Sequence, residues 1–152
     1  MRLDRLPAAM ATRLAELECP DFTTTPWVAG PPLGERRVAI VSSAGLVVRG
    51  DKVFRGRDAD YRAIPAETAA GELLCSHISI NFDRNGFQED WNVVFPLDRL
   101  RELAAERAIG SVAATHYSFM GATDPVQMVE GAGEVARRLK ADRVDAVLLT
   151  SV

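Results

Sequence analysis

The fold is decided by an almost wholly apolar run, RVAIV at residues 37–41, which passes directly into the small residues SSAG at 42–45. Continuous apolar strands belong to sheets that are covered on both faces, and such sheets are usually parallel. Further runs of this kind occur along the chain, and they are bounded by polar or glycine-containing segments. The predicted strands are 37–41, 61–64, 73–80, 111–116 and 145–150.

Two helix-then-strand units follow in the second half of the chain. Pro96 and Asp98 open a helix that Gly110 closes, and Asp124 followed by Pro125 starts another helix. The order strand, helix, strand, helix, strand is typical of right-handed parallel crossovers. The sequence therefore predicts a three-layer α/β fold. We expect a mostly parallel, Rossmann-like or flavodoxin-like sheet with crossover helices, incomplete at the C-terminus.

Length and composition restrict the class of protein. The 152 residues are 47% hydrophobic and 26% charged, with a formal net charge of −3. They suit a single domain overall, with an N-terminal helix and proline-rich arm at 1–34 and an α/β domain at 35–152. The 18 Lys and Arg residues do not cluster, and no apolar run approaches about 20 residues, so we expect no nucleic-acid or membrane partner. No signal peptide is evident and Cys19 and Cys75 form no paired motif, so the expected compartment is the cytoplasm.

Polar side chains follow the predicted strands at their carboxyl ends, where open parallel sheets bind ligands. Because these ends meet at one edge, we expect the side chains to converge on one rim. Asp83 and Arg84 could hold a polar substrate, since arginine binds carboxylates in bidentate fashion, or they could close a loop as a surface ion pair, which the local sequence favours. The expected substrate-binding residues at this rim are Ser42, Ser43, Asn81, Asp83, Arg84, Tyr117 and Met120.

The two histidines receive different interpretations. His116 lies at a predicted strand end and is a candidate general acid or base. An equally good interpretation is a rim histidine whose ring bonds a backbone carbonyl. His77 lies in mid-strand and is interpreted as structural, with its ring bonded to the adjoining loop. Two histidines without a third ligand predict no metal site, and the three-glycine fingerprint of dinucleotide binding is absent.

A tryptophan between two short polar residues, at Asp90-Trp91-Asn92, indicates a loop that is held by packing. Asp90 and Asn92 either cap backbone groups, which is the favoured interpretation, or contribute to the site. Cys75 lies on an apolar strand and is interpreted as an inert buried thiol.

Four sequence motifs occur together in this chain: VAIVSSAG at 38–45, SHISINFD at 76–83, WNVVFPLDRL at 91–100 and HYSFMG at 116–121. In combination they resemble the selenoprotein B subunits of the glycine, sarcosine, betaine and D-proline reductase family. The similarity is greatest to the shorter, D-proline reductase-like branch, and it covers about residues 20–152.

This resemblance implies reductive cleavage of the carbon–nitrogen bond of a small amino acid or amine. It implies a partner subunit whose pyruvoyl group activates the substrate, and a selenocysteine or cysteine that attacks the activated carbon. A selenolate suits this role because selenols ionise more readily than thiols. In this interpretation His116, Asp83 and the Ser42-Ser43 turn line the substrate pocket.

The sequence departs from the family where the chemistry is expected. In the family the final strand is followed at once by the selenocysteine or cysteine, whereas this sequence stops at Val152. We therefore expect the chain to be the portion of a selenoprotein that precedes its selenocysteine, whose codon is otherwise read as stop. By itself it should bind no cofactor and be inactive, and an uncovered sheet face should favour homo-oligomers. The alternative is a non-catalytic small-ligand-binding or assembly domain derived from that fold, and the downstream reading frame distinguishes the two.

Overall fold

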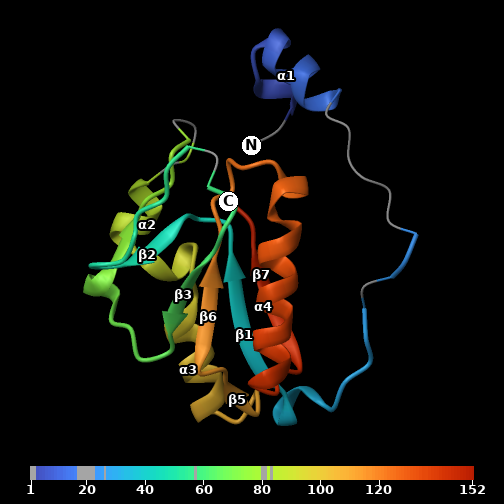
Figure 1. Cartoon of the computed structure of the whole chain (residues 1–152), viewed down its shortest axis with the longest axis vertical. Helices are drawn as coiled ribbons and strands as arrows, with labels where there is room; N and C mark the ends of the chain where they lie inside the picture. The colour runs from blue at the N-terminus through green and yellow to red at the C-terminus, as the bar shows by residue number, and fades with distance from the viewer. Residues whose placement is uncertain (1–2, 17–22, 26, 57, 80–81, 83) are drawn as a thin grey trace.

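The computed structural model describes residues 3–16, 23–25, 27–56, 58–79, 82 and 84–152. Its main sheet is built around β1, whose edges are both occupied by parallel partners (Figure 1). β7 pairs with one edge of β1, so β5 and β6 share the other edge, and β3 extends the sheet beyond β6. The strands of this sheet are β1 (Arg37–Ser42), β3 (Arg62–Pro65), β5 (Ser111–Val112), β6 (Thr115–Ser118) and β7 (Ala146–Thr150).

The sheet is mixed, which corrects the prediction of a mostly parallel one. β3 runs antiparallel to β6, with Arg62 opposite Ser118 and Ile64 opposite His116. In the described residues between β1 and β3 there is no helix, so the chain forms no parallel crossover at this point. The parallel pairs of β1 with β5, β6 and β7 agree with the prediction, because helices do precede those strands.

The predicted strand 73–80 is wrong in both length and place. Within the described residues 73–79 the only strand is β4 (Leu73–Cys75), and it pairs antiparallel with β2 (Leu46–Val48) in a separate two-stranded sheet. Gly45 has a φ of 63°, a conformation that glycine adopts readily, and it turns the chain out of the main sheet after β1. Its carbonyl then accepts the backbone N–H of Ser76 at 2.9 Å, which fixes the chain beyond β4 against this turn.

The predicted strand 111–116 is divided into β5 and β6. The backbone N–H of Ala113 still donates to the carbonyl of Val38 at 2.9 Å. The next N–H of β1 on this edge, that of Ile40, donates instead to the imidazole Nδ1 of His116. Ladder pairing therefore resumes only where Val41 lies opposite Tyr117.

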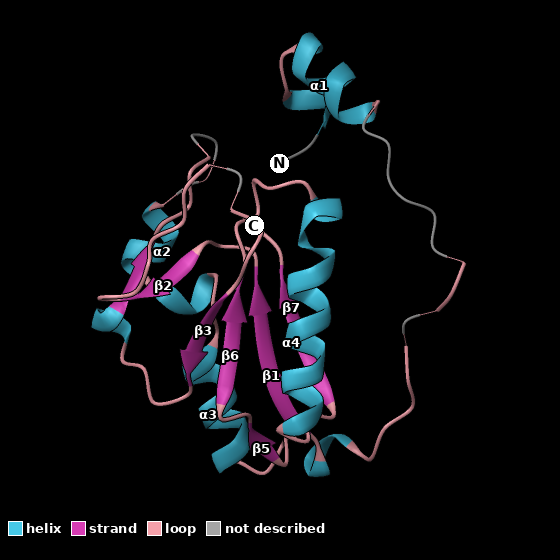
Figure 2. Cartoon of the chain, in the orientation of Figure 1, coloured by secondary structure: helices cyan, strands magenta, loops and turns pink. Residues whose placement is uncertain are grey.

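Helices α3 (Leu97–Ala105) and α4 (Val129–Ala141) pack against opposite faces of the sheet (Figure 2). Ile40 contributes to the core under α3 with Leu97 and Leu100, and the neighbouring Ala39 contributes to the core under α4 with Val135 and Leu139. This alternation follows from the period of two along a strand. The predicted helix starts are confirmed: Pro96 precedes α3, and the Asp124 carboxylate accepts the N–H of Val126. A Rossmann-like or flavodoxin-like architecture remains a prediction.

The N-terminal helix α1 (Ala8–Ala15) has no buried residue, and in Figure 1 it lies apart from the sheet. Trp27 is 74% exposed, and the guanidinium of Arg36 lies 5.8 Å from its ring centroid. Between β4 and α3 lie α2 (Asn85–Glu89) and a 3₁₀ turn at Trp91–Val93. None of the helices within the described residues combines the length and apolar character that a bilayer crossing requires.

Candidate functional site at the carboxyl end of the sheet

The carboxyl ends of β1 and β7 are joined through one carbonyl group. The hydroxyls of Ser42 and Thr150 both donate to the carbonyl oxygen of Val94, at 2.9 and 3.0 Å. Val94 lies in the segment that leads into α3, so these bonds close the rim of the sheet against the chain that crosses it. Ser42 is 1% exposed, and its hydroxyl also accepts the N–H of Ala44 at 3.2 Å. Its role in the structure is to hold this crossing in place.

Ser43 joins three strand ends at the same rim. Its N–H donates to the carbonyl of Thr150 at 3.0 Å, and its carbonyl accepts the N–H of Gly121 at 2.8 Å. Its hydroxyl oxygen accepts the backbone N–H of Val152 at 3.0 Å. A Cβ at position 121 would lie 2.7 Å from the carbonyl oxygen of Ser43, so the close approach requires glycine.

A cleft of about 510 Å³ opens beside this rim. Its volume is within the range of small-molecule sites. The wall is largely apolar, and Val152, two residues beyond the end of β7, is part of it. The cleft is lined by His77, Ser79, Phe82, Gly86, Phe87, Val93, Val94, Gly121, Ala122 and Val152.

Among the described residues that line this cleft, His77 has the ionisable side chain. It is 6% exposed, its ring stacks on Phe82 with centroids 4.6 Å apart, and its Nδ1 accepts the backbone N–H of Ser79 at 3.1 Å. Burial lowers the pKa of His77, and the positive charge of Arg84 lowers it further. The ring is therefore neutral at neutral pH, with its proton on Nε2.

The predicted substrate-binding residues Asn81 and Asp83 lie outside the described residues. Arg84 donates to the carbonyl of His77 and, at 3.4 Å, to that of Ser79. Its guanidinium therefore fastens the segment that carries His77, and it adds positive charge beside the cleft.

The structure places His116 in the core and not at the end of a strand, which corrects its predicted position. The residue is 0% exposed, and its ring meets Phe95 edge-on with centroids 5.8 Å apart. Burial, and next the charge of Arg101, lower the pKa of His116 to about 4. A role as general acid or base remains an untested prediction. The predicted strand 111–116 ended at His116, whereas β6 continues to Ser118. The His116 side chain takes one backbone N–H of β1 and thereby interrupts the ladder between β5 and β6.

Tyr117 and Met120 also lie away from the cleft. Tyr117 belongs to the core beneath α4, where Tyr61 packs edge-on against it at 5.5 Å. Met120 is 0% exposed and packs with Val47 and Phe54 beside the two-stranded sheet. The structure thus brings Ser42, Ser43 and Arg84 to the rim or near it, but neither Tyr117 nor Met120 lines the cleft.

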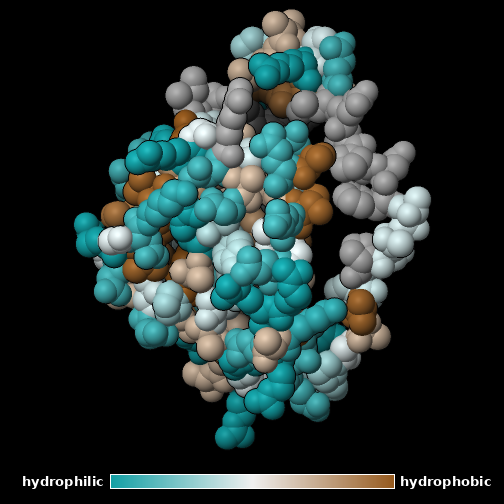
Figure 3. Space-filling view, in the orientation of Figure 1, coloured by the Kyte–Doolittle hydropathy of each residue, from teal (hydrophilic) through white to brown (hydrophobic). Residues whose placement is uncertain are grey.

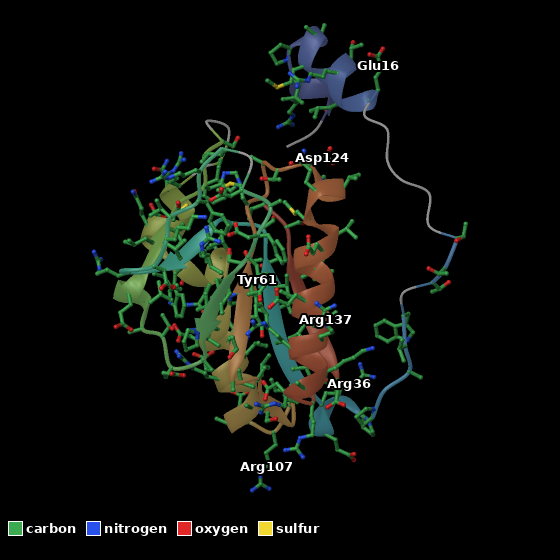
Figure 4. All side chains as sticks on the ribbon, viewed as in Figure 1. Glu16, Arg36, Tyr61, Arg107, Asp124 and Arg137 are labelled. Carbon is green, nitrogen blue, oxygen red and sulfur yellow. The ribbon has the colours of Figure 1, made fainter. Side chains whose placement is uncertain are left out.

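A second groove, of about 580 Å³, lies where the start of α4 meets the end of β7. Ser42, Ser43 and Leu149 contribute to its wall, which is almost wholly apolar, and Leu149 is 73% exposed. Apolar side chains also gather near the N-terminal end of α4 in Figure 3, where Val126 and Val129 are 76% and 69% exposed. Figure 4 shows Asp124 at this rim, with Arg36 and Arg107 at the opposite end of the sheet.

The segment around Trp91 is held by packing, as the sequence indicates. Trp91 is 8% exposed and its indole N–H donates to the carboxylate of Asp98 at 2.9 Å. Asp90 accepts the backbone N–H of Asn92, and the Asn92 side chain accepts the N–H of Asp98. Asp90 and Asn92 therefore cap backbone groups, which confirms the favoured interpretation. The half-buried Cys75 points its thiol at the carbonyl of Ala44, 3.8 Å away.

Sequence reasoning missed His77 as a residue of the cleft, because strand periodicity placed it inside a sheet. Within the described part of the chain, no three His, Cys, Asp or Glu side chains are grouped so as to hold a metal ion.

Comparison with known proteins gives one family. The model of the glycine/sarcosine/betaine reductase selenoprotein B family matches residues 14–152. The D-proline reductase subunit gamma of Acetoanaerobium sticklandii is 37% identical over 122 residues, which are 78% of this chain and 50% of that protein. No solved structure matches the chain significantly.

Two further relatives are components of other reductase complexes. The betaine reductase complex component B subunit beta of Peptoclostridium acidaminophilum is 37% identical over 125 residues, covering 78% of this chain and 28% of that protein. The glycine reductase complex component B subunit gamma of Symbiobacterium thermophilum is 30% identical over 153 residues, covering 90% of this chain and 33% of that protein. The chain spans about half the length of the first relative and about a third or less of these two.

Proposed function

Because the chain belongs to the selenoprotein B family of glycine, sarcosine and betaine reductases, we propose that it forms part of an amino-acid reductase subunit. The reaction proposed is reductive cleavage of the carbon–nitrogen bond of a small amino acid or amine such as D-proline, glycine, sarcosine or betaine. Relatives named for each of these substrates match the chain, so the particular substrate is left open.

The observation that carries the proposal is the position of Val152. Val152, two residues beyond β7, lines a cleft of about 510 Å³, and the hydroxyl of Ser43 accepts its backbone N–H. A selenolate or thiolate joined directly after this strand would stand at the mouth of the cleft, on the edge where α/β sheets bind their ligands. The family resemblance assigns the nucleophile to that place.

The reaction balances as a two-electron reduction. The chalcogen anion attacks the carbon that bears nitrogen, the carbon–nitrogen bond breaks, and the nitrogen leaves with its electron pair and takes a proton. A dithiol then returns two electrons, the carbon takes a proton, the chalcogen is released, and the dithiol becomes a disulfide. A pyruvoyl group on a partner subunit would supply an electrophilic carbonyl that activates the amine.

In this proposal the residues of the chain have two tasks: they position the segment that carries the nucleophile, and they exclude water from the cleft. Ser43 fixes the direction in which the chain leaves β7, and the hydroxyls of Ser42 and Thr150 hold Val94 across the rim. The apolar side chains of Phe82 and Phe87 keep one wall of the cleft dry. A dry wall protects a reactive chalcogen anion and strengthens the electrostatic interactions around it.

The test starts with the gene. Sequencing downstream of the Val152 codon should reveal an in-frame UGA followed by further coding sequence. The product that includes this sequence, combined with the pyruvoyl-forming partner and dithiothreitol, should cleave the carbon–nitrogen bond of one of the four substrates. Cleavage releases ammonia or an amine from glycine, sarcosine or betaine and opens the ring of D-proline, so the reduced carboxylic acid is the readout common to all four. The 152-residue chain with the same partner should form none of it. A reading frame without the UGA contradicts the proposal, and so does normal turnover by the 152-residue chain.

A further inference from the structure

One edge of the main sheet is open along β7. The inner edge of β7 pairs with β1, whereas none of the strands in the described residues pairs with its outer edge. The carbonyl of Thr150 accepts the N–H of Ser43, so Thr150 turns its backbone groups toward β1. Successive residues of a strand turn these groups to opposite edges, so those of Val147 and Leu149 point outward. Lysine and proline, which commonly protect such an edge, are absent from AVLLT at Ala146–Thr150, so β7 is a template for a further strand.

The side chains of β7 suit a strand that is covered on both faces. Val147 and Leu149 lie on the face of the sheet that α4 covers, and they are 40% and 73% exposed. Leu148 alternates with them and lies on the face that α3 covers, where it is 39% exposed. Apolar side chains on both faces are typical of strands inside a sheet with helices on either side. The apolar surface of β7 therefore exceeds what the described elements cover.

The side of α4 that faces β7 is open as well. The groove of about 580 Å³ lies between Ala132 and Leu149, and another of about 220 Å³ lies between Ala136 and Val147. The two follow one another along the same helix and the same strand, which lie side by side in Figure 1. Ala132 and Ala136 are exposed and one turn apart, and such small side chains allow a second helix to approach closely. The two grooves together form an apolar trough beside α4.

The direction of the chain determines which face a further crossover helix occupies. The chain passes from β6 across β1 to β7, and α4 is the helix of that crossover. Crossovers between parallel strands are almost always right-handed, so the next one in the same direction places its helix on the same face as α4. The trough lies on that face. The topology and the exposed apolar surface thus indicate one position for an additional helix.

We propose that the trough binds an amphipathic helix formed by the polypeptide that follows Val152, and that the next strand of this polypeptide pairs in parallel with the outer edge of β7. The inference rests on the proposed function, in which the reading frame continues past Val152. A helix of about 12 residues, nearly the length of α4, spans β7. The D-proline reductase subunit gamma of Acetoanaerobium sticklandii is long enough to contain such a unit, because the match covers 50% of it.

A second copy of the chain suits this surface less well. Two copies joined edge to edge through β7 would each gain a strand, but neither would bring a helix to the trough of the other. The polypeptide that follows Val152 can supply both elements, since it starts at the end of β7. It is therefore the occupant that satisfies the open edge and the apolar trough together.

Hydrogen exchange tests the pairing of the strand. It compares the 152-residue chain with the full product, in which cysteine is encoded in place of selenocysteine. The amides of Val147 and Leu149 should exchange freely in the 152-residue chain and about a hundredfold or more slowly in the full product. The amide of Ala113, which donates to the carbonyl of Val38 inside the sheet, should be protected in both and serves as the control.

Alkylation tests the position of the helix. Ala132 and Ala141 are both exposed residues of α4, but only Ala132 lines the trough. Iodoacetamide should modify A132C in the full product about tenfold or more slowly than in the 152-residue chain. A141C, the matched control, should react equally fast in both. Mass spectrometry of the separate peptides keeps other cysteines out of the measurement.

A charge in the trough should distinguish the two proteins. Leu149 is 73% exposed in the 152-residue chain, so L149E should leave its urea midpoint nearly unchanged. In the full product the same carboxylate would be buried beneath the helix, and the midpoint should fall by about 0.5 M or more. L33E is the control, because Leu33 is 58% exposed and lines neither groove. It should change the midpoint of neither protein.

Free exchange of Val147 in the full product overturns the inference, and so does alkylation of A132C at one rate in both proteins. Protection of Val147 that rises with the concentration of the 152-residue chain assigns the edge to a second copy and also overturns it. A full product that cleaves a substrate while β7 stays open refutes this inference alone. A full product with β7 protected and A132C shielded, but without cleavage of any of the four substrates, refutes the reductase and leaves the docking site intact.

Discussion

The imidazole Nδ1 of His116 accepts the backbone N–H of Ile40 at 2.9 Å, in a core where His116 and Ile40 are both 0% exposed. A side chain from one strand thereby takes the place of a ladder bond of its neighbour, and the predicted strand 111–116 divides at this point. The bond also requires a neutral ring, because a proton on Nδ1 would face the N–H of Ile40. The protonation state of one side chain is thus coupled to the integrity of the central sheet.

Replacing His116 should show this coupling directly. H116A removes the acceptor of a buried N–H and leaves a cavity, so the free energy of unfolding should fall by about 3 kcal/mol. H116N is the matched control, because its amide oxygen can stand near the position of Nδ1 and accept the same N–H. Urea unfolding should rank the wild-type chain above H116N, and H116N above H116A. Equal losses in the two variants would contradict the role of the hydrogen bond.

Stability should fall on mild acidification. The pKa of His116 is about 4 in the folded chain, below its ordinary value of 6.5, so only the unfolded chain takes up this proton between those values. The contribution is fully present above pH 6.5 and is lost as the pH falls toward 4. Between pH 7.5 and 5 the loss from His116 is about 2 kcal/mol.

Urea unfolding at pH 7.5, 6.5, 5.5 and 5 measures this dependence above the range in which most carboxylates titrate. H116N should have a shallower slope. The slope that remains should include a contribution from His77. Burial and the charge of Arg84 lower the pKa of His77, so its protonation also reduces stability as the pH falls. A slope in H116N as steep as that of the wild-type chain would exclude His116 as its source.

Asp98 holds the turn before α3 in place. Its carboxylate accepts the indole N–H of Trp91 at 2.9 Å and pairs with Arg101 at 2.7 Å. D98A leaves the buried indole without its acceptor, and unfolding should become easier by about 1–2 kcal/mol. E102A is the control, since Glu102 pairs with Arg99 on the exposed side of the same helix and should cost less than about 0.5 kcal/mol.

Fluorescence reports on the same change, because Trp91 is buried and Trp27 is exposed. In D98A the buried component should become more accessible to iodide, whereas the exposed component should not change. An unaltered quenching profile together with unaltered stability would show that Asp98 is dispensable for the turn.

Gly121 should tolerate no side chain. A Cβ would lie 2.7 Å from the carbonyl oxygen of Ser43, the group that accepts the Gly121 N–H, so G121A must displace the rim and should lose about 1–3 kcal/mol. G71A is the matched control, because a Cβ at position 71 meets no atom within 4 Å. It should be neutral or gain up to about 1 kcal/mol. Urea unfolding of both variants provides the comparison, and a stable G121A would contradict the close approach.

Much of the fold could be predicted from the sequence, because in several segments the local sequence pattern and the tertiary structure favour the same conformation. The apolar run of β1 is buried on both faces, and the Asp124-Pro125 pair begins a helical segment through a cap that needs only neighbouring residues. The strand prediction at 73–80 failed because Gly45 redirects the chain, and the partner of β4 is a three-residue strand too short to carry a pattern. A cleft lies beside the edge at which the sequence predicts the site, with Ser42 and Ser43 at its rim, whereas Tyr117 and Met120 pack elsewhere; the roles of these residues in binding stay predictions.

By itself, then, the sequence determined the family, the central strand, the helices of the second half and the edge at which the cleft lies. Each of these depends on composition, periodicity or a cap formed within a few residues. The tertiary structure alone decided that β3 runs antiparallel, that His116 is a core residue and that His77 lines the cleft. These depend on which distant groups meet: the N–H of Ile40 donates to the imidazole of His116, and His77 and Val152 line the same cleft. Such pairings have no period in the sequence, because they are selected by the burial of polar groups once the chain has packed.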